Sequence, residues 1–153
     1  QRADDYAGFS LLLGDRQGLW YFTNSLPAAE RQPLALKPGI YGLSNARLDT
    51  PWPKVVTGRE RLARVLDNGP AHDALATVVN DRTLAEPQQL QAQSLHGDMD
   101  QVLSAQFIVT AAYGTRSTTT LWVDNDSRAH WRERSFDADG LMTGSTEQQF
   151  TLA

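Results

Sequence analysis

Two short segments of the sequence carry polar residues that serve no hydrophobic pattern and could take part in chemistry. In the first, Ser44 and Asn45 end an extended stretch, and a proline-rich turn follows. An asparagine amide held at a strand end can donate a hydrogen bond to a developing oxyanion or to a ligand carbonyl. In the second segment, residues 113–117, Arg116 lies between two extended runs. Its planar guanidinium can bind a carboxylate or polarise a carbonyl.

Both residues also have a plainer explanation. Asparagine at the end of a strand commonly bonds to its own backbone in a turn, and an arginine in a surface hairpin is commonly exposed to solvent. Taken alone, the spacing favours the plainer explanation for Asn45 and for Arg116.

The sequence offers little for other kinds of catalytic or metal site. With no cysteine in 153 residues, the chain has no disulfide, no thiolate zinc site and no cysteine nucleophile of its own. Its three histidines (His72, His96 and His130) do not follow the spacing of zinc sites. We therefore expect no metal site and no required cofactor. Haem needs only one axial ligand, so His96 with Met99 is the pair to check, although a solvated loop histidine is the simpler explanation.

Composition narrows the class of protein. The formal net charge is −4 and the basic residues are scattered, which disfavours nucleic acid as the main partner. Arg59, Arg61 and Arg64 have Glu60 among them, a pattern typical of a solvated helix face. No apolar run approaches the roughly 18 residues of a membrane span, and no signal-peptide pattern is present. We expect a soluble, cytoplasmic protein.

Hydrophobic periodicity predicts an α+β fold in a single domain, residues 1–153. Segregated helices and strands favour this class over a doubly wound parallel sheet. The elements follow from apolar stripes at helical spacing, from alternation in strands and from Gly, Pro, Asn and Asp at the turns. In chain order we expect a hairpin (9–13 and 19–23), a turn-rich connection (25–38), a third strand (39–44), two helices (54–67 and 71–80), a long polar loop (81–100) and four strands (105–112, 118–124, 129–135 and 146–152).

Several motifs in this order form an unusual combination. The longest run reads Pro-Gly-Ile-Tyr-Gly-Leu-Ser-Asn over residues 38–45 and Leu-Asp-Thr-Pro-Trp-Pro-Lys over residues 48–54. Together with residues 6–12 and 113–117, it resembles the NRDE family, the family of the transport and Golgi organisation 2 proteins. The resemblance covers nearly the whole chain, loosely over residues 71–101.

The front of the chain departs from the family pattern. The chain begins at Gln1, and it lacks the Met-Cys start and the Asn-Arg-Asp-Glu signature of the family's N-terminal part. We therefore expect it to correspond to the C-terminal part of such a protein. The N-terminal segment, which lies outside this chain, is the partner that we expect it to need.

The resemblance implies a fold and two site residues. The family is similar to N-terminal-nucleophile (Ntn) hydrolases, which have an α/β/β/α sandwich of stacked antiparallel sheets. In their relatives an N-terminal cysteine is the nucleophile, supported by a later asparagine and a late arginine. On that pattern Asn45 is the oxyanion or substrate amide and Arg116 is the late arginine, so the functional explanation of both becomes favoured. Because the nucleophile is absent from this chain, the catalytic set is incomplete and enzyme activity stays open.

The resemblance also implies a ligand. Family members are associated with haem trafficking and with lipid or acyl-CoA metabolism. We expect a pocket for a hydrophobic small molecule, either haem or an acyl compound, lined by Trp20, Tyr41, Ser44, Trp52 and Tyr113. The alternative is an Ntn-type hydrolase of amide (C–N) bonds. A third possibility is a scaffold with a degenerate site and only protein partners.

Overall fold

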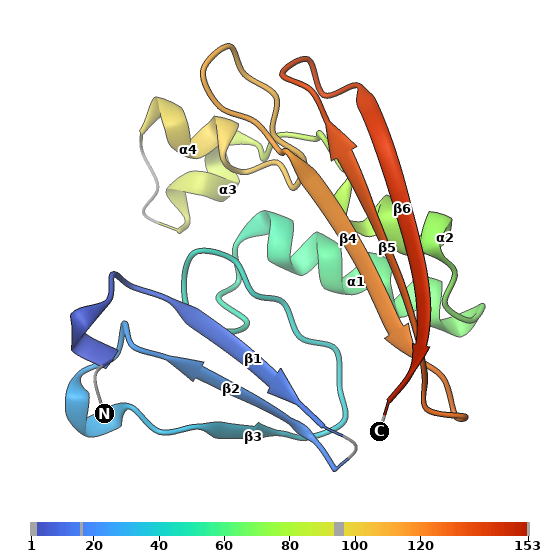
Figure 1. Ribbon diagram of the computed structural model, residues 1–153. Helices are drawn as coiled ribbons and strands as arrows, with labels where there is room; N and C mark the ends of the chain where they lie inside the picture. Colours follow the sequence, from blue (N-terminus) through green and yellow to red (C-terminus); the bar gives the residue numbers. More distant parts are fainter. Residues whose placement is uncertain (1–2, 16, 94–96, 153) are drawn as a thin grey trace. The chain divides into compact units, whose positions relative to one another are not determined.

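The computed structural model describes residues 3–15, 17–93 and 97–152 (Figure 1). The chain divides into two compact units, Gln1–Thr50 and Pro51–Ala153. Each unit is described by itself below. Both combine antiparallel sheet with helical segments, and the α+β class predicted from the sequence is confirmed. Among the described residues, no helix is long and apolar enough to cross a membrane.

The first unit contains a three-stranded antiparallel sheet in the order β1-β2-β3 (Figure 1). The predicted hairpin is confirmed: its turn is closed by Asp15, whose backbone N–H donates to the Gly18 carbonyl over 3.0 Å, and whose carboxylate accepts from the Gln17 and Gly18 N–H groups. Two short 3₁₀ turns flank the sheet strands. The elements are η1 (Ala3–Asp5), β1 (Ser10–Gly14), β2 (Leu19–Thr23), η2 (Ala28–Glu30) and β3 (Leu34–Leu36).

The third strand of this sheet lies earlier in the chain than predicted. Residues 39–44 are not a strand, and β3 instead comes from the segment predicted as a turn-rich connection. It pairs Leu34 with Tyr21 of β2. Residues 39–44 are drawn into a loop because Gly42 exchanges hydrogen bonds with Asp49: its N–H donates to the Asp49 carboxylate, and its carbonyl accepts from the Asp49 N–H, both over 2.7 Å.

The second unit contains another three-stranded antiparallel sheet, in the order β4-β5-β6, against which the helix α2 packs, and α1 packs on α2. Both long predicted helices are confirmed; Pro53 opens the first, where its missing N–H costs nothing. The region predicted as a polar loop (81–100) also contains one five-residue helix and the start of a second. The elements are α1 (Pro53–Asp67), α2 (His72–Val79), α3 (Pro87–Gln91), α4 (Asp98–Val102), β4 (Ser117–Val123), β5 (Arg128–Phe136) and β6 (Met142–Thr151).

The predicted strand over residues 105–112 is wrong, so the described part of the sheet has three strands where the sequence indicated four. The backbone N–H groups of this segment donate to nearby residues or to a distant loop. The Phe107 N–H donates to the Asp81 carbonyl over 2.8 Å. Ile108 and Thr115 exchange hydrogen bonds, which folds the segment back on itself. These amides are therefore not available to a sheet ladder.

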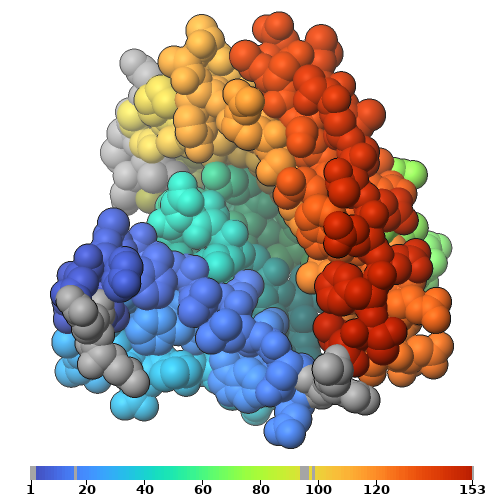
Figure 2. Space-filling view, viewed as in Figure 1, coloured from blue at the N-terminus to red at the C-terminus, as the bar shows by residue number. Residues whose placement is uncertain are grey.

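The two faces of the β4-β5-β6 sheet differ in their surroundings. Thr120 and Trp122 point to the side on which α2 packs, and the His72 ring of α2 lies 4.4 Å from that of Trp122. On the opposite face Leu121, Val123 and Phe150 are about half exposed. Every residue of β6 is exposed, and Figure 2 shows this strand in red at the surface.

The core of the second unit centres on an aromatic pair. The rings of Phe107 and Phe136 meet edge to face with centroids 4.7 Å apart, and both side chains are buried. Arg82 lies over the Phe107 ring, and its guanidinium donates to the Gly140 carbonyl over 2.7 Å. Gly140 has a φ of 70°, in the left-handed region that glycine adopts without strain. This contact connects the segment after α2 to the turn between β5 and β6.

Candidate functional site

Two hollows in the first unit contain part of the predicted site. We name them by their characteristic residues. The tyrosine hollow, of about 580 Å³, is lined by Tyr21, Tyr41 and several leucines. The asparagine hollow, of about 570 Å³, is lined by Phe9, Ser44 and Asn45 among others. Thr23 and Arg47 line both, so the two hollows are neighbours.

The tyrosine hollow is mainly apolar with a charged margin. Tyr21 is buried, and its hydroxyl is 3.4 Å from the Ser10 hydroxyl. Tyr41 is half-buried and donates its hydroxyl hydrogen to the Lys37 carbonyl over 2.8 Å. The apolar wall of the hollow is made by Leu26, Leu34, Leu36 and Leu48, and the charged residues that line the hollow are Glu30, Lys37, Arg47 and Asp49. Aromatic and aliphatic walls with a few polar groups are typical of small-molecule sites.

The asparagine hollow depends on the loop that Asp49 closes. Asp49 has a φ of 57°, and its two hydrogen bonds with Gly42 hold the ends of the loop together. Asn45 is exposed on this loop, and within the described residues its side-chain amide has no hydrogen-bond partner. The plainer explanation, an amide bonded to its own turn, therefore does not describe Asn45. Its amide is available to a ligand.

Asn24, which sequence reasoning missed, holds the start of the chain against the end of β2. Its buried carboxamide oxygen accepts from the Phe9 N–H over 2.7 Å. Its amide group donates to the carbonyls of Ala3 and Ala7 at 3.0 and 3.1 Å. Phe9 in turn lines the asparagine hollow. The only signal in the sequence is a turn-forming residue after a strand, which does not reveal these partners.

The other predicted site residues lie elsewhere. Trp20 points to the face of the sheet opposite Tyr21 and is not among the described residues that line either hollow. Trp52, Tyr113 and Arg116 belong to the second unit. The structure thus groups Tyr41, Ser44 and Asn45 around neighbouring hollows. The joint role of Asn45 and Arg116 stays a prediction.

Arg116 and Tyr113 lie in an exposed segment before β4. The backbone N–H and the hydroxyl of Thr110 both donate to the Tyr113 carbonyl, and the Tyr113 N–H donates to the Thr110 hydroxyl, which closes a tight turn. The Arg116 carbonyl accepts from the Phe136 N–H over 2.9 Å, while its side chain is exposed. Backbone pairing therefore positions this segment, and among the described residues the Arg116 guanidinium has no hydrogen-bond or ion-pair partner.

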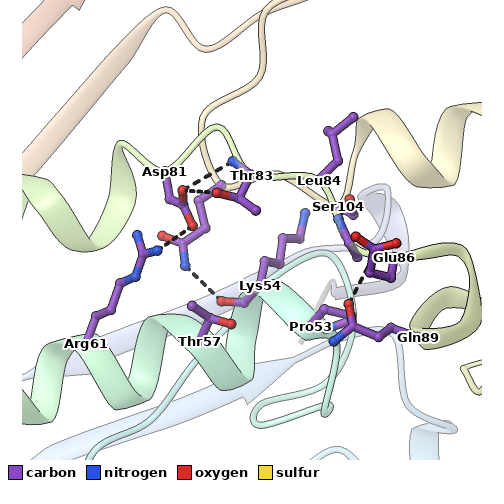
Figure 3. A pocket seen from close by; sticks show the side chains of 12 residues that line it. Pro53, Lys54, Thr57, Arg61, Asp81, Thr83, Leu84, Glu86, Gln89 and Ser104 are labelled. Carbon is purple, nitrogen blue, oxygen red and sulfur yellow. Dashed lines mark hydrogen bonds and ion pairs between the residues drawn. The ribbon is translucent and has the colours of Figure 1, made fainter.

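A third cavity, in the second unit, was not predicted from the sequence. This Lys54 pocket, of about 240 Å³, lies between the first two turns of α1 and the segments around residues 81–89 and 104–106 (Figure 3). Within it, Arg61 and Asp81 form an ion pair at 2.9 Å. Burial disfavours the charged form of Asp81, but hydrogen bonds from Thr83 and the Arg61 guanidinium hold the pKa of that carboxyl below its usual value.

Lys54 itself is half-buried in this pocket. Its ammonium group donates to the Leu103 carbonyl over 2.6 Å and lies 5.7 Å from the Trp52 ring centre. Its backbone carbonyl accepts from the Gln106 amide over 2.9 Å. Burial lowers the pKa of the Lys54 amine because the charged form loses its hydration.

Comparison with known proteins confirms the family predicted from the motifs. The Transport and Golgi organisation 2 family matches residues 1–138. The chain belongs to this family. A Transport and Golgi organization protein 2 homolog from Bos taurus is 32% identical over 163 residues, covering 96% of this chain and 58% of the relative. Homologs from Mus musculus and Homo sapiens are each 30% identical over 162 residues, with the same coverage. The chain thus spans 58% of the length of these relatives.

In this Transport and Golgi organisation 2 family member, a partly buried polar cluster includes residues of α2 and of the second sheet, and His72 and Thr120 are its buried members. The His72 ring shares a 2.7 Å hydrogen bond with the Thr120 hydroxyl. Trp122 lies between His72 and His130, and its ring stacks on that of His130 with centroids 4.8 Å apart. His130 pairs with Asp124 at 3.0 Å, and this hydrogen bond lowers the pKa of the Asp124 carboxyl.

Neither this cluster nor the rest of the described chain groups three histidine or acidic side chains for a metal ion. Of the His96–Met99 pair that the sequence suggested for haem, His96 lies outside the described residues, and Met99 is exposed.

Proposed function

We propose that this Transport and Golgi organisation 2 family member binds a hydrophobic small molecule, haem or an acyl compound, and takes part in its trafficking. The tyrosine hollow carries the proposal. Its volume of about 580 Å³ falls within the range of small-molecule sites, and leucines and two tyrosine rings form its walls. Lys37 and Arg47 at its margin provide cations for a carboxylate, a group that haem and fatty acids share.

The residues present fit haem in one further respect. A tyrosine oxygen is one of the axial ligands that proteins offer to haem iron, and Tyr41 and Tyr21 both line the hollow. Tyr41 is the more accessible of the two, because Tyr21 is only 6% exposed. An acyl chain would need no such ligand and would use only the apolar wall.

A matched pair of substitutions tests the tyrosine hollow. Leu34 and Leu13 are both exposed leucines on strands that flank β2, but Leu34 lines the hollow and Leu13 points to the opposite face. Leu34→Arg should weaken binding of haem or a fatty acid about tenfold or more, because the site would bury an unpaired charge. Leu13→Arg should change it little. Haem titration followed by the Soret band and fatty-acid binding by calorimetry measure both. No binding of either ligand to the unmodified protein overturns the proposal.

The second candidate is Ntn-type hydrolysis of an amide bond. It is favoured by Asn45, whose amide is exposed in the asparagine hollow without a described partner. An N-terminal cysteine outside this chain would attack the amide, Asn45 would stabilise the oxyanion and Arg116 would orient the substrate. Removing an oxyanion donor typically costs about 10²–10³-fold in kcat, so Asn45→Ala is expected to lose that much. A retained initiator methionine, detected by mass spectrometry, excludes this mechanism.

Two further proposals concern the architecture of the fold and the cellular location. We expect the β4-β5-β6 sheet to be one layer of an α/β/β/α sandwich, because α2 covers one face and the other carries half-exposed Leu121, Val123 and Phe150. A second sheet on that face would bury them. A cytoplasmic location also stays a proposal. If neither haem, acyl compounds nor amides interact with the protein, the scaffold alternative with protein partners is favoured.

A further inference from the structure

We propose that the Lys54 pocket is a second binding site, for a small monocarboxylate. This proposal does not depend on the tyrosine hollow, since every residue that lines the Lys54 pocket belongs to the second unit.

The first argument is the state of the Lys54 ammonium. Its side chain is half-buried, and one of its three N–H donors is used by the Leu103 carbonyl at 2.6 Å. No carboxylate among the described residues forms an ion pair with it. A partly buried cation without a counterion is costly unless an anion approaches it. Two donors on the same nitrogen are left for that anion.

The second argument is that Asp81, one of the two acidic residues that line the pocket, is already paired and cannot serve as the counterion. Asp81 lines the same pocket, but Arg61 holds one of its oxygens at 2.9 Å. The other oxygen accepts from the Thr83 hydroxyl at 2.7 Å and from the Thr83 N–H at 3.2 Å. Asp81 is therefore fully engaged. Figure 3 shows the Arg61–Asp81 and Asp81–Thr83 interactions on one side of the pocket, with Lys54 reaching toward Ser104 and Glu86.

The third argument concerns the remaining lining, which suits one negative charge and a short apolar part. Pro53, Leu84 and Ala85 provide apolar wall. The side-chain oxygen Oε1 of Gln89 accepts from the Glu86 backbone N–H at 3.0 Å, which leaves the two side-chain N–H groups of Gln89 to donate to a ligand. Glu86 also lines the pocket, and its carboxylate repels a dianion more strongly than a monoanion. The volume of about 240 Å³ admits only a short chain.

Lysine NMR provides a direct test because the chain has only two lysines, Lys37 and Lys54. With ¹³C-labelled lysine, butyrate should shift the Lys54 side-chain signal with saturation and raise the pKa of the Lys54 amine, because a bound anion favours the charged form. Lys37, exposed at the tyrosine hollow, is the internal reference. A response of Lys37 alone supports the first site and overturns the second. Equal, non-saturating shifts of both signals also overturn it.

Variants and a second anion sharpen the test. Butyrate should raise the melting temperature of the unmodified protein but not that of Lys54→Met, and Lys54→Arg should retain part of the effect. Glu86→Gln should tighten butyrate binding about two- to fivefold by removing a partly screened repulsion. If Glu86→Gln instead lowers the pKa of Lys54 and butyrate does not bind, Glu86 is the counterion and the proposal is wrong. Inorganic phosphate binding as tightly as butyrate overturns the preference for a monocarboxylate.

Discussion

Asn24 and Asp49 shape the loops of the first unit because they replace backbone partners that its short strands cannot supply. Asn24 satisfies the Phe9 N–H and two carbonyls near the start of the chain, and Asp49 satisfies both backbone groups of Gly42. Buried backbone groups need such partners. Since Asn45 lies on the loop that Asp49 closes, the asparagine hollow depends on a residue that does not line it.

Two glycines with positive φ allow steric crowding to be separated from backbone strain. A Cβ at Gly69 would meet nothing within 4 Å, whereas at Gly140 it would lie 2.7 Å from Val109 and 2.9 Å from Arg82. Gly69→Ala should lower the free energy of unfolding by about 1–2 kcal/mol, because of the left-handed backbone alone. Gly140→Ala should lower the free energy of unfolding by about 1–3 kcal/mol more than Gly69→Ala does, since the added methyl group overpacks the core. Urea unfolding of both variants measures the difference, and equal costs would contradict the packing around Gly140.

His72 should make the protein less stable as the pH falls below about 6.5. Burial, and then the positive charge of Arg132, lowers the pKa of the His72 ring; His130 adds to this, while Glu147 and Asp73 oppose it. Above about pH 6.5 the ring is neutral in the folded and the unfolded chain, so it adds no pH dependence. Between that pH and the lowered pKa only the unfolded chain takes up the proton, so stability falls.

His72→Gln tests this pH dependence. Urea midpoints at about pH 7.5 and about pH 5.5 should differ more for the unmodified protein than for the variant, because glutamine does not titrate. The comparison uses the change with pH rather than the stability itself, since the variant also loses the ring contact with Trp122. An unchanged pH dependence in His72→Gln would show that the ring is readily protonated in the folded state.

Single site residues could be predicted from the sequence only where a local motif marks them. Ser44 and Asn45 stand out because their motif interrupts the hydrophobic pattern, and the structure places both at one hollow. Lys54 does not stand out, since a lysine at the start of a helix is usually solvated. Its burial depends on Leu103, far along the chain, and no local pattern contains that contact.

At the scale of elements, alternation and helical stripes located the regular structure, but not every strand. Helices α1 and α2 and strands β4, β5 and β6 lie where predicted, within a few residues. Residues 105–112 have strand-like composition, yet the Asp81 carbonyl and Thr115 occupy their backbone groups. The five-residue helices α3 and α4 are too short for a periodic signal. Competition for hydrogen bonds, not propensity, decided the structure of residues 105–112.

Hydrogen exchange should distinguish the central strand of the second sheet from its edges. β5 pairs on both sides, whereas β4 and β6 each pair on one side within the described residues. In an antiparallel edge strand, alternate N–H groups point away from the ladder. We therefore expect uniform protection along β5 and alternating fast and slow amides along β6, measured by NMR. Uniform protection of β6 would instead reveal a further strand paired with its free edge.

At the scale of the whole molecule, the two units differ in what stabilises them. The second has a buried aromatic pair, Phe107 and Phe136, and ion pairs in which Arg132 joins Asp73 of α2 to Glu147 of β6. In the first unit, Tyr21 is the one large hydrophobic residue that is buried among those described. A segment of about 50 residues buries a small fraction of its surface on folding and is at best marginally stable on its own.

This difference predicts the behaviour of the separate units. Residues 51–153 expressed alone should give a dispersed amide NMR spectrum and a cooperative unfolding transition, because their core and their ion pairs are internal. Residues 1–50 alone should give the narrow spectrum of an unfolded chain. A collapsed spectrum for residues 51–153 would mean that their packing needs the first unit or the rest of the protein.

The contact between α1 and Gln106 has a consequence for how this family can vary in evolution. A Cβ at Gly58 would lie 2.9 Å from the Gln106 amide nitrogen, the same nitrogen that donates to the Lys54 carbonyl. A side chain at position 58 therefore displaces Gln106, unless position 106 shrinks at the same time. We expect the two positions to covary across relatives: glycine with glutamine, or a larger residue with a smaller one. In relatives with a larger residue at position 58 and a smaller one at position 106, we expect the hydrogen bond that joins α1 to residue 106 to be lost.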